Sequence, residues 1–222
     1  MAVLQAEQVT LYDLTQHFGL QASSDGDFFP EWQENLPPIT PQEAQQLARI
    51  KANYLHLVMR SLLEDLVKMV VVSPLLDLAG FYLPPFYTTT EPSVTVTLAD
   101  QDLTLRGRLD ILVLQDQLWV LAIESKRASF SLEVGMPQIL AYLLAAPVQE
   151  RPLFGCVTNG GHFIFVKLIR DAQGPWYQFS DEFSLRRDRD LDQILAIIKG
   201  LAQRFQPQTE RGKSPPQRGG MA

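Results

Sequence analysis

Two runs of alternating residues, separated by only three polar positions, constrain the fold of this chain most strongly. Apolar and polar side chains alternate through residues 103–114, and a second alternating run covers residues 118–126. Since successive side chains of a β-strand point to opposite faces, each run predicts a strand with two distinct faces. Residues 115–117 form a short polar connection, so we expect an antiparallel hairpin.

The predicted hairpin brings charged side chains onto a common face. In the first strand, Asp110 shares its face with Arg106 and Arg108. In the second strand, Glu124 and Lys126 lie together, opposite a set of apolar residues. The alternation therefore predicts a cluster of two acids and three bases on one side of the hairpin.

Pairing of the strands sets the distance between the two acids. If Leu114 pairs with Leu118, Asp110 faces Ala122, and Glu124 lies one diagonal step away at a Cβ separation of up to about 8 Å. Two carboxylates at that separation can hold one divalent cation. Hard oxygen ligands suit Mg²⁺ or Mn²⁺, which proteins hold through one or two carboxylates together with waters and substrate phosphate.

Such a cluster has the groups that phosphodiester hydrolysis requires. The reaction needs water made nucleophilic near neutral pH and positive charge against the transition state, and a bound metal supplies both. Lys126 would orient or deprotonate the water and stabilise the phosphoryl oxygens. We expect the metal and the ammonium group to hold the pKa values of Asp110 and Glu124 below their ordinary values.

These residues resemble the PD-(D/E)xK, or restriction endonuclease-like, nuclease superfamily. Asp110 matches the first acid of the motif, and residues 124–126 match the E-x-K. Gln138 and Tyr142 match the Q-x-x-x-Y element of many superfamily nucleases, and their spacing places both side chains on one face of a helix.

The resemblance extends to the N-terminal nuclease domain of type I restriction enzyme R (motor) subunits. Residues 154–160 and 163–168 are similar to its G-x-x-T-N-G hairpin, and Glu64 with residues 74–76 and 79–81 is similar to its opening helix. The match covers roughly residues 50–200. It implies an α/β (α+β) fold with a restriction endonuclease-like core, in which helices flank a mixed central β-sheet.

Two departures from the family pattern are visible. Leu109 stands where the name-giving motif has proline, a change that touches no metal-binding atom. The chain also has no G-x-x-x-x-G-K-[ST] phosphate loop. The resemblance therefore implies a stand-alone nuclease domain and not a complete motor subunit.

The resemblance also implies roles for individual residues. Asp110, Glu124 and the backbone carbonyl of Ser125 would bind the metal, and Lys126 would act as catalytic base or stabiliser. Glu64 and Gln138 would be auxiliary catalytic residues. Simpler interpretations are that Glu64 is a solvated helix residue or an ion-pair partner of Lys68, and that Gln138 packs or caps. Candidate DNA contacts are Arg106, Arg108, Arg127 and Tyr142.

Some of these contact candidates also have structural interpretations. Tyr142 would be a core residue with its hydroxyl at the pocket edge. Arg106 and Arg108 would be strand-edge charges that prevent aggregation. The single cysteine, Cys156, excludes an internal disulfide and is most simply a buried strand residue.

Composition bounds the partners and the location. The net charge of −6 argues against a protein that coats DNA, although residues 186–222 have eight basic and four acidic residues, a balance of +4, against −10 in the rest. No apolar run reaches membrane-spanning length and the N-terminus lacks a signal peptide, so we expect no membrane partner and a cytoplasmic location.

The chain divides into three expected parts. Residues 1–41 would form an N-terminal extension that wraps the domain, residues 42–205 the nuclease-like domain, and residues 206–222 a disordered tail. Thr40, Pro41 and Glu43 predict the start of a long helix that continues to about residue 72. Further predicted elements are helices 9–18, 136–145 and 191–205 and strands 93–98, 154–158 and 163–169.

Three functional hypotheses follow. The first is a magnesium-dependent deoxyribonuclease of the restriction or repair type, with DNA as its partner. The second is a catalytically inactive nuclease-fold subunit that serves in nucleic-acid binding or assembly, as a homodimer or with a partner subunit. The aromatic segment around Phe28, Phe29 and Trp32 would suit such an interface. The third is a soluble domain in which the carboxylates are coincidental.

Overall fold

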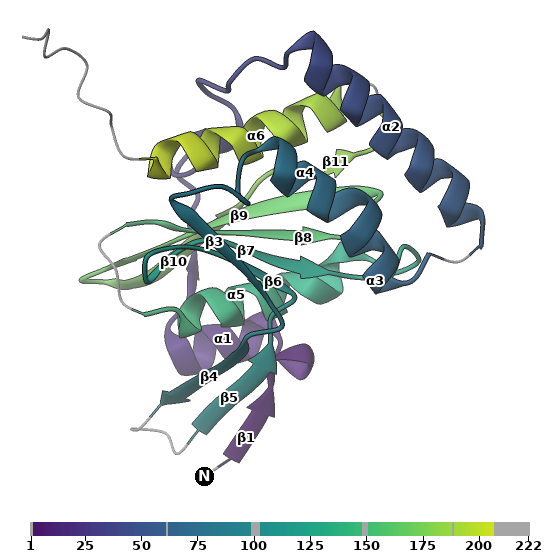
Figure 1. Ribbon diagram of the computed structural model, residues 1–222. Coiled ribbons are helices and arrows are strands. Elements are labelled where there is room, and N and C mark those ends of the chain that lie inside the picture. Colours follow the sequence, from purple (N-terminus) through teal and green to yellow (C-terminus); the bar gives the residue numbers. More distant parts are fainter. Residues whose placement is uncertain (1, 61, 99–102, 148–150, 188, 207–222) are drawn as a thin grey trace, which may run out of the picture.

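A large mixed sheet runs through the middle of the structure, with helices on both of its faces (Figure 1). The computed structural model describes residues 2–60, 62–98, 103–147, 151–187 and 189–206. The strands of this sheet are β2 (Gln21–Ala22), β3 (Phe86–Thr90), β6 (Ile111–Gln115), β7 (Leu118–Ser125), β8 (Leu153–Thr158), β9 (His162–Asp171), β10 (Gly174–Phe179) and β11 (Phe183–Ser184). Their order is β2-β10-β9-β8-β7-β6-β3, and β11 pairs with β9. The pairs β7–β8 and β2–β10 are parallel and the others are antiparallel, which confirms the predicted fold class.

A smaller sheet lies below the large one. It consists of β1 (Ala2–Gln5), β4 (Ser93–Leu98) and β5 (Leu103–Arg108), in the order β1-β5-β4. The prediction of one strand over residues 103–114 is therefore wrong, because the chain passes from β5 in the small sheet to β6 in the large sheet at Leu109 and Asp110. The backbone of this crossing is held by hydrogen bonds from Leu109 N to the Pro92 carbonyl (3.2 Å) and from Glu91 N to the Asp110 carbonyl (3.0 Å).

The hairpin of β6 and β7 is antiparallel as predicted, but its register differs. Ile111 pairs with Ile123, and the register shifts between Val113 and Leu114. The assumed pairing of Leu114 with Leu118 is wrong, because Leu114 pairs with Trp119 and the turn is tighter than expected. Extending the observed register by one residue places Asp110 directly opposite Glu124, closer than the diagonal position predicted from the sequence.

The predicted long helix begins as expected and then breaks. At the start of α2 (Pro41–Leu57), Thr40 and Glu43 form the expected capping box. A 3₁₀ turn (Val58–Arg60), α3 (Glu64–Val67), a π-helical turn (Lys68–Val72) and α4 (Ser73–Leu78) follow. Continuity to residue 72 is wrong because the chain leaves the helix to bury Leu62, whose carbonyl accepts a hydrogen bond from Ala128 N. Pro74 lies in the first turn of α4, where its missing N–H is tolerated.

Two apolar layers join the helices to the sheet. Helices α2, α3, α4 and α6 (Asp190–Phe205) lie over one face, and α5 (Gly135–Ala145) with α1 (Leu11–Phe18) covers the other (Figure 1). Buried apolar residues form a cluster on each side of the sheet. Helices α1, α5 and α6, strand β4 and the β8–β9 hairpin confirm the predicted elements, whereas β3 and β10 were not predicted. Cys156 is buried within β8, as expected.

The N-terminal segment packs against the large sheet. Phe29 is buried in the cluster under α6, and Glu31 pairs with Lys167 of β9 and Arg204 of α6, each at 2.9 Å. The predicted tail lies outside the described residues from residue 207 onward. Within the described part of the chain, no helix is both long and apolar enough to span a bilayer.

Candidate active site

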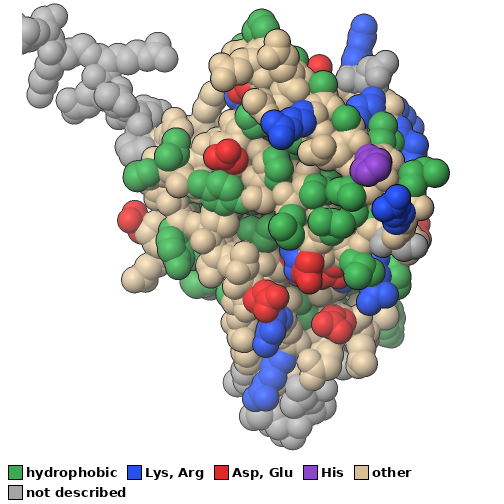
Figure 2. Space-filling model, turned by 45° about the vertical axis from the view of Figure 1, so that its right-hand side comes forward, with side chains coloured by type: hydrophobic (Ala, Val, Ile, Leu, Met, Phe, Trp, Pro, Cys, Tyr) green, Lys and Arg blue, Asp and Glu red, His purple; other side chains and the backbone are tan. Residues whose placement is uncertain are grey.

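The predicted site residues come from four separate places in the fold and meet at one cavity. Asp110 lies at the crossing between the two sheets, Glu124 and Lys126 at the end of β7, and Gln138 on α5, while Glu64 opens α3. All five line a cavity of about 580 Å³. The face in Figure 2 shows acidic, basic and apolar side chains close together.

Asp110 is buried and each of its carboxylate oxygens has a partner. The backbone N–H of Ser125 donates to Oδ2 at 2.6 Å, which ties the crossing to the end of β7. Lys68 Nζ lies 3.3 Å from Oδ1 and donates to it. These two contacts fix the carboxylate between the main sheet and the helical layer.

Lys126 is held by two acceptors on neighbouring elements. Its Nζ donates to Glu124 Oε1 at 2.8 Å and to Gln138 Oε1 at 2.6 Å. An ammonium group has three N–H donors, so one remains for the cavity. The side chain of Gln138 bridges Lys126 and Tyr142, and its auxiliary catalytic role stays a prediction.

Tyr142 does not reach the surface. Its side chain is fully buried, its hydroxyl accepts a hydrogen bond from Gln138 Nε2 (2.9 Å), and it donates to the Arg108 carbonyl (2.9 Å). Listing Tyr142 among candidate DNA contacts is therefore wrong, and the core interpretation is confirmed. A Q-x-x-x-Y pair on a helix packed against a sheet faces inward, where the hydroxyl supports its neighbour instead of meeting a ligand.

Lys68 also belongs to the site, although it was not among the residues predicted from the sequence. Its Nζ lies 3.0 Å from Asp65, 3.3 Å from Asp110 and 3.7 Å from Glu64. Burial lowers the pKa of Lys68, but its pairs with Asp65 and Asp110 outweigh burial and hold that pKa above its ordinary value. The only sign of Lys68 in the sequence was its expected ion pair with Glu64. Its contact with Asp110 could not be predicted, because it depends on the break in the helix after α2.

The surroundings of Glu124 raise its pKa to about 8. Burial is the largest cause and the Asp110 carboxylate adds to it, while Lys126 opposes both effects. The pKa of Glu64 is also raised, by burial and by Asp110. Without a bound cation, desolvation thus outweighs the lysines. The lowered pKa that was expected for Glu124 with a metal bound stays a prediction.

The donor groups fit a hard cation. Glu124 Oε2 is buried, and among the described residues it has no hydrogen-bond partner. A buried carboxylate oxygen without a donor is costly, so a ligand at this position would relieve a real deficit. No group of three His, Cys, Asp or Glu side chains in a metal-binding arrangement occurs in the part of the chain that the structure describes. Protein donors here would be Asp110, Glu124 and the Ser125 carbonyl.

The rim of the cavity combines charge with exposed apolar surface. Arg108 is largely exposed and pairs with Glu91 at 3.1 Å, while Arg127 is exposed beside the cavity. Arg106 is also exposed, so contact of these three arginines with DNA stays a prediction. Phe130 and Val134 line the cavity and are about half exposed (47% and 54%), so this rim is not a purely electrostatic surface.

Comparison with known proteins shows a likeness among solved structures only. No protein-family model matches the chain, and no curated protein matches it. Among solved structures, it is similar to a fragment of an HsdR subunit of a type I restriction enzyme from Vibrio vulnificus YJ016, with a TM-score of 0.39 and 20% sequence identity. The match covers 62% of this chain and 26% of that one, so the chain spans about a quarter of the length of that solved fragment.

Proposed function

We propose that this chain is a metal-dependent nuclease that hydrolyses DNA phosphodiester bonds. The observation that supports it most is the meeting of Asp110, Glu124 and Lys126 at one cavity, with Glu124 Oε2 buried and, within the described residues, unpartnered. In a cluster with a purely structural role, we would expect the lysines to donate hydrogen bonds to all of the carboxylate oxygens. An oxygen left over beside a second carboxylate is the arrangement expected of residues that share a ligand.

Each residue has a distinct role in this proposal. Asp110 and Glu124 would hold Mg²⁺ or Mn²⁺, with the Ser125 carbonyl as a third donor. When bound, such an ion activates water and offsets the charge that develops on the phosphoryl group. The hydrogen bond from Ser125 N keeps Asp110 facing the end of β7, so the two carboxylates stay together before any substrate arrives.

Lys126 would stabilise the phosphoryl oxygens. Two of its N–H groups are fixed by Glu124 and Gln138, so the third has a defined direction into the cavity. A donor fixed in this way stabilises developing negative charge without a reorganisation cost, which is the main source of electrostatic catalysis. Gln138 contributes by positioning this ammonium group, and Glu64 lies at the cavity as an auxiliary carboxylate.

The test is cleavage of linear and circular DNA, single- and double-stranded, with Mg²⁺ or Mn²⁺ and with an EDTA control. We expect metal-dependent cutting that falls by at least about 100-fold in Asp110→Asn and in Lys126→Ala. Asp27→Asn, an exposed acid on the N-terminal segment, is the matched control and should cut like the wild type. Cutting of circles would establish endonuclease action. Equal activity in all three variants would contradict the proposal.

A second function, that of an inactive nuclease-fold subunit, is favoured by Lys68. Its ammonium group already pairs with Asp110, so the cluster has a purely structural interpretation as well. Metal binding separates the two functions. A nuclease should bind Mn²⁺ in a calorimetric titration and bind it more weakly after Glu124→Gln, whereas a structural subunit should show no Mn²⁺ binding that depends on Glu124.

A further inference from the structure

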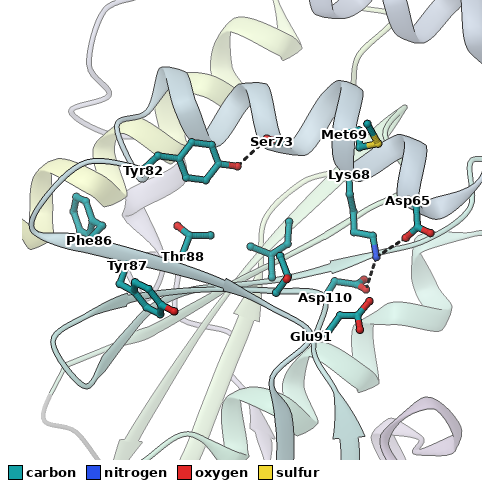
Figure 3. A pocket seen from close by; sticks show the side chains of 12 residues that line it. Asp65, Lys68, Met69, Ser73, Tyr82, Phe86, Tyr87, Thr88, Glu91 and Asp110 are labelled. Carbon is teal, nitrogen blue, oxygen red and sulfur yellow. Dashed lines mark hydrogen bonds and ion pairs between the residues drawn. The ribbon is translucent and has the colours of Figure 1, made fainter.

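A second groove continues from the candidate site along the protein surface. It has a volume of about 730 Å³ and runs between the π-helical turn with α4 on one side and β3 on the other (Figure 3). Four residues, Asp65, Lys68, Glu91 and Asp110, line both this groove and the cavity of the candidate site. A ligand in the groove would therefore meet the candidate site at Asp110.

Charge is confined to the end of the groove that adjoins the site. There Lys68 pairs with Asp65 and Asp110, and Glu91 pairs with Arg108. The other lining residues are uncharged and bear aromatic rings, aliphatic groups or hydroxyls. This part of the groove suits a ligand with apolar faces and hydrogen-bonding edges, and it offers nothing that would attract a phosphate.

Two tyrosines dominate the uncharged part. Tyr87 of β3 is 65% exposed, and Tyr82, before β3, is 44% exposed. The Tyr82 hydroxyl donates to Ser73 Oγ at 2.9 Å, which holds the ring against α4. Figure 3 shows both rings, with Phe86, at the opposite end of the groove from Asp110 and Lys68. An exposed ring that is held in place, as that of Tyr82 is, offers a stacking surface at small entropic cost.

We propose that this groove binds unpaired nucleobases next to the phosphodiester at Asp110, so that the substrate is single-stranded or locally unpaired nucleic acid. This rests on the proposed function for its catalytic end. Nucleobases combine π-faces that stack on aromatic side chains with polar edges that hydrogen-bond to hydroxyls. In a duplex these faces are covered by neighbouring bases, so the tyrosines could not stack on them.

The charge of the whole chain agrees with this substrate class. With a net charge of −6, the protein gains little affinity from displacing counterions along a phosphate backbone. Stacking supplies affinity that does not depend on net charge, and it discriminates between paired and unpaired strands. The groove would thus direct a strand into the site by its bases, while the charged end receives the phosphate.

Binding in EDTA tests the groove separately from cleavage. The anisotropy of a fluorescein-labelled single-stranded oligodeoxynucleotide, and of the same sequence as a duplex, is measured with wild type, Tyr82→Ala and Tyr87→Ala. Tyr87→Phe keeps the ring, and Tyr12→Ala removes a tyrosine of α1 that is 72% exposed and does not line the groove. Because Tyr87 is mostly exposed, its removal should leave the fold intact.

We expect Tyr82→Ala and Tyr87→Ala each to raise the Kd for the single strand by about 5- to 150-fold and to leave duplex binding unchanged. Tyr87→Phe and Tyr12→Ala should bind like wild type. Equal single-strand Kd values in wild type and both alanine variants would overturn the proposal, as would tighter binding of the duplex than of the single strand.

The outcomes also separate this inference from the proposed function. Binding of a single strand that depends on the tyrosine rings, without any metal-dependent cutting, would support nucleobase binding in the groove and contradict the proposed nuclease activity. Metal-dependent cutting with a KM unaffected by either alanine substitution would support the nuclease and contradict nucleobase binding in the groove. The exposed tyrosines beside β3 would then be assigned to a protein partner.

Discussion

The four oxygens of Asp110 and Glu124 differ sharply in their surroundings. Asp110 Oδ2 accepts from the Ser125 backbone, Asp110 Oδ1 accepts from Lys68, and Glu124 Oε1 accepts from Lys126. Glu124 Oε2 alone among these four is without a donor in the described structure. Lys68 from the helical layer and Lys126 from the end of β7 therefore approach the acid pair and leave one oxygen for a ligand.

Gln138 should matter for rate more than for stability. Replacing it with Leu removes one of the two acceptors of Lys126, and we expect kcat for DNA cleavage to fall about 10- to 100-fold, with little change in KM. Gln138→Glu keeps an acceptor oxygen at the same position and should recover part of the rate. Two results would contradict a positioning role. One is a loss of kcat in Gln138→Glu as large as that in Gln138→Leu, and the other is a fall in Tm large enough to unfold Gln138→Leu.

Sequence predicted the members of the site that follow a local period. Alternation along the strand places Glu124 and Lys126 together, and a spacing of four along α5 aligns Gln138 with Tyr142. Lys68 could not be assigned in this way, because its contact with Asp110 depends on where a broken helix turns back over the sheet. The stacking residues Tyr82 and Tyr87 were missed for the same reason, since no period links them to Asp110.

At the level of elements, the sequence predicted which segments form helices and strands. It did not predict where a helix breaks or where the register of a strand pair shifts. The capping box at Thr40 is a local signal, and α2 begins there. The end of α2 is decided by burial of Leu62, a tertiary contact. Similarly, the turn after Gln115 was expected, but the register shift between Val113 and Leu114 depends on how β7 fits between β6 and β8.

The link between α2 and α6 should weaken in acid. Burial raises the pKa of Glu43, but hydrogen bonds from Lys199 (Nζ to Oε1, 2.7 Å) and Thr40 lower it below its ordinary value of 4.5. A lowered folded-state pKa means that the stabilisation is present above pH 4.5 and is lost as the pH falls through the folded-state pKa. We expect Glu43→Gln to reduce the free energy of unfolding by about 0.5–2 kcal/mol at neutral pH.

Urea unfolding at neutral pH and at acidic pH measures this effect. The difference between wild type and Glu43→Gln should shrink toward zero once the carboxyl is protonated. Glu34→Gln, at an exposed acid of the N-terminal segment that precedes α2, is the control and should show no such difference. A difference that stays constant from neutral to acidic pH would rule out the ionised carboxylate as its source.

Across the whole molecule, one buried acid joins three distant parts of the chain. Glu31 from the N-terminal segment is 7% exposed in its side chain and pairs with Lys167 of β9, whose side chain is 8% exposed. The same acid pairs with Arg204 near the end of α6, which reaches solvent. The segment, the sheet and the last helix therefore share a single ionic junction.

Removing that acid should destabilise the protein strongly. Glu31→Ala leaves Lys167 buried without its carboxylate, and we expect a loss of about 3–5 kcal/mol in the free energy of unfolding. Replacing both partners by apolar residues, as in Glu31→Leu with Lys167→Met, removes the stranded charge and should restore most of the stability. If the single and double variants unfold at the same urea concentration, the penalty does not come from the buried ammonium group.

The crossing at Leu109 and Asp110 also limits how this chain can vary. Side chains alternate on both strands, so one residue added or removed between Arg108 and Ile111 would turn Asp110 to the opposite face and shift one sheet against the other. Replacement of Leu109 by another apolar residue changes neither face. At this point of the chain, geometry fixes the number of residues, and the burial of Leu109 requires only that its side chain be apolar.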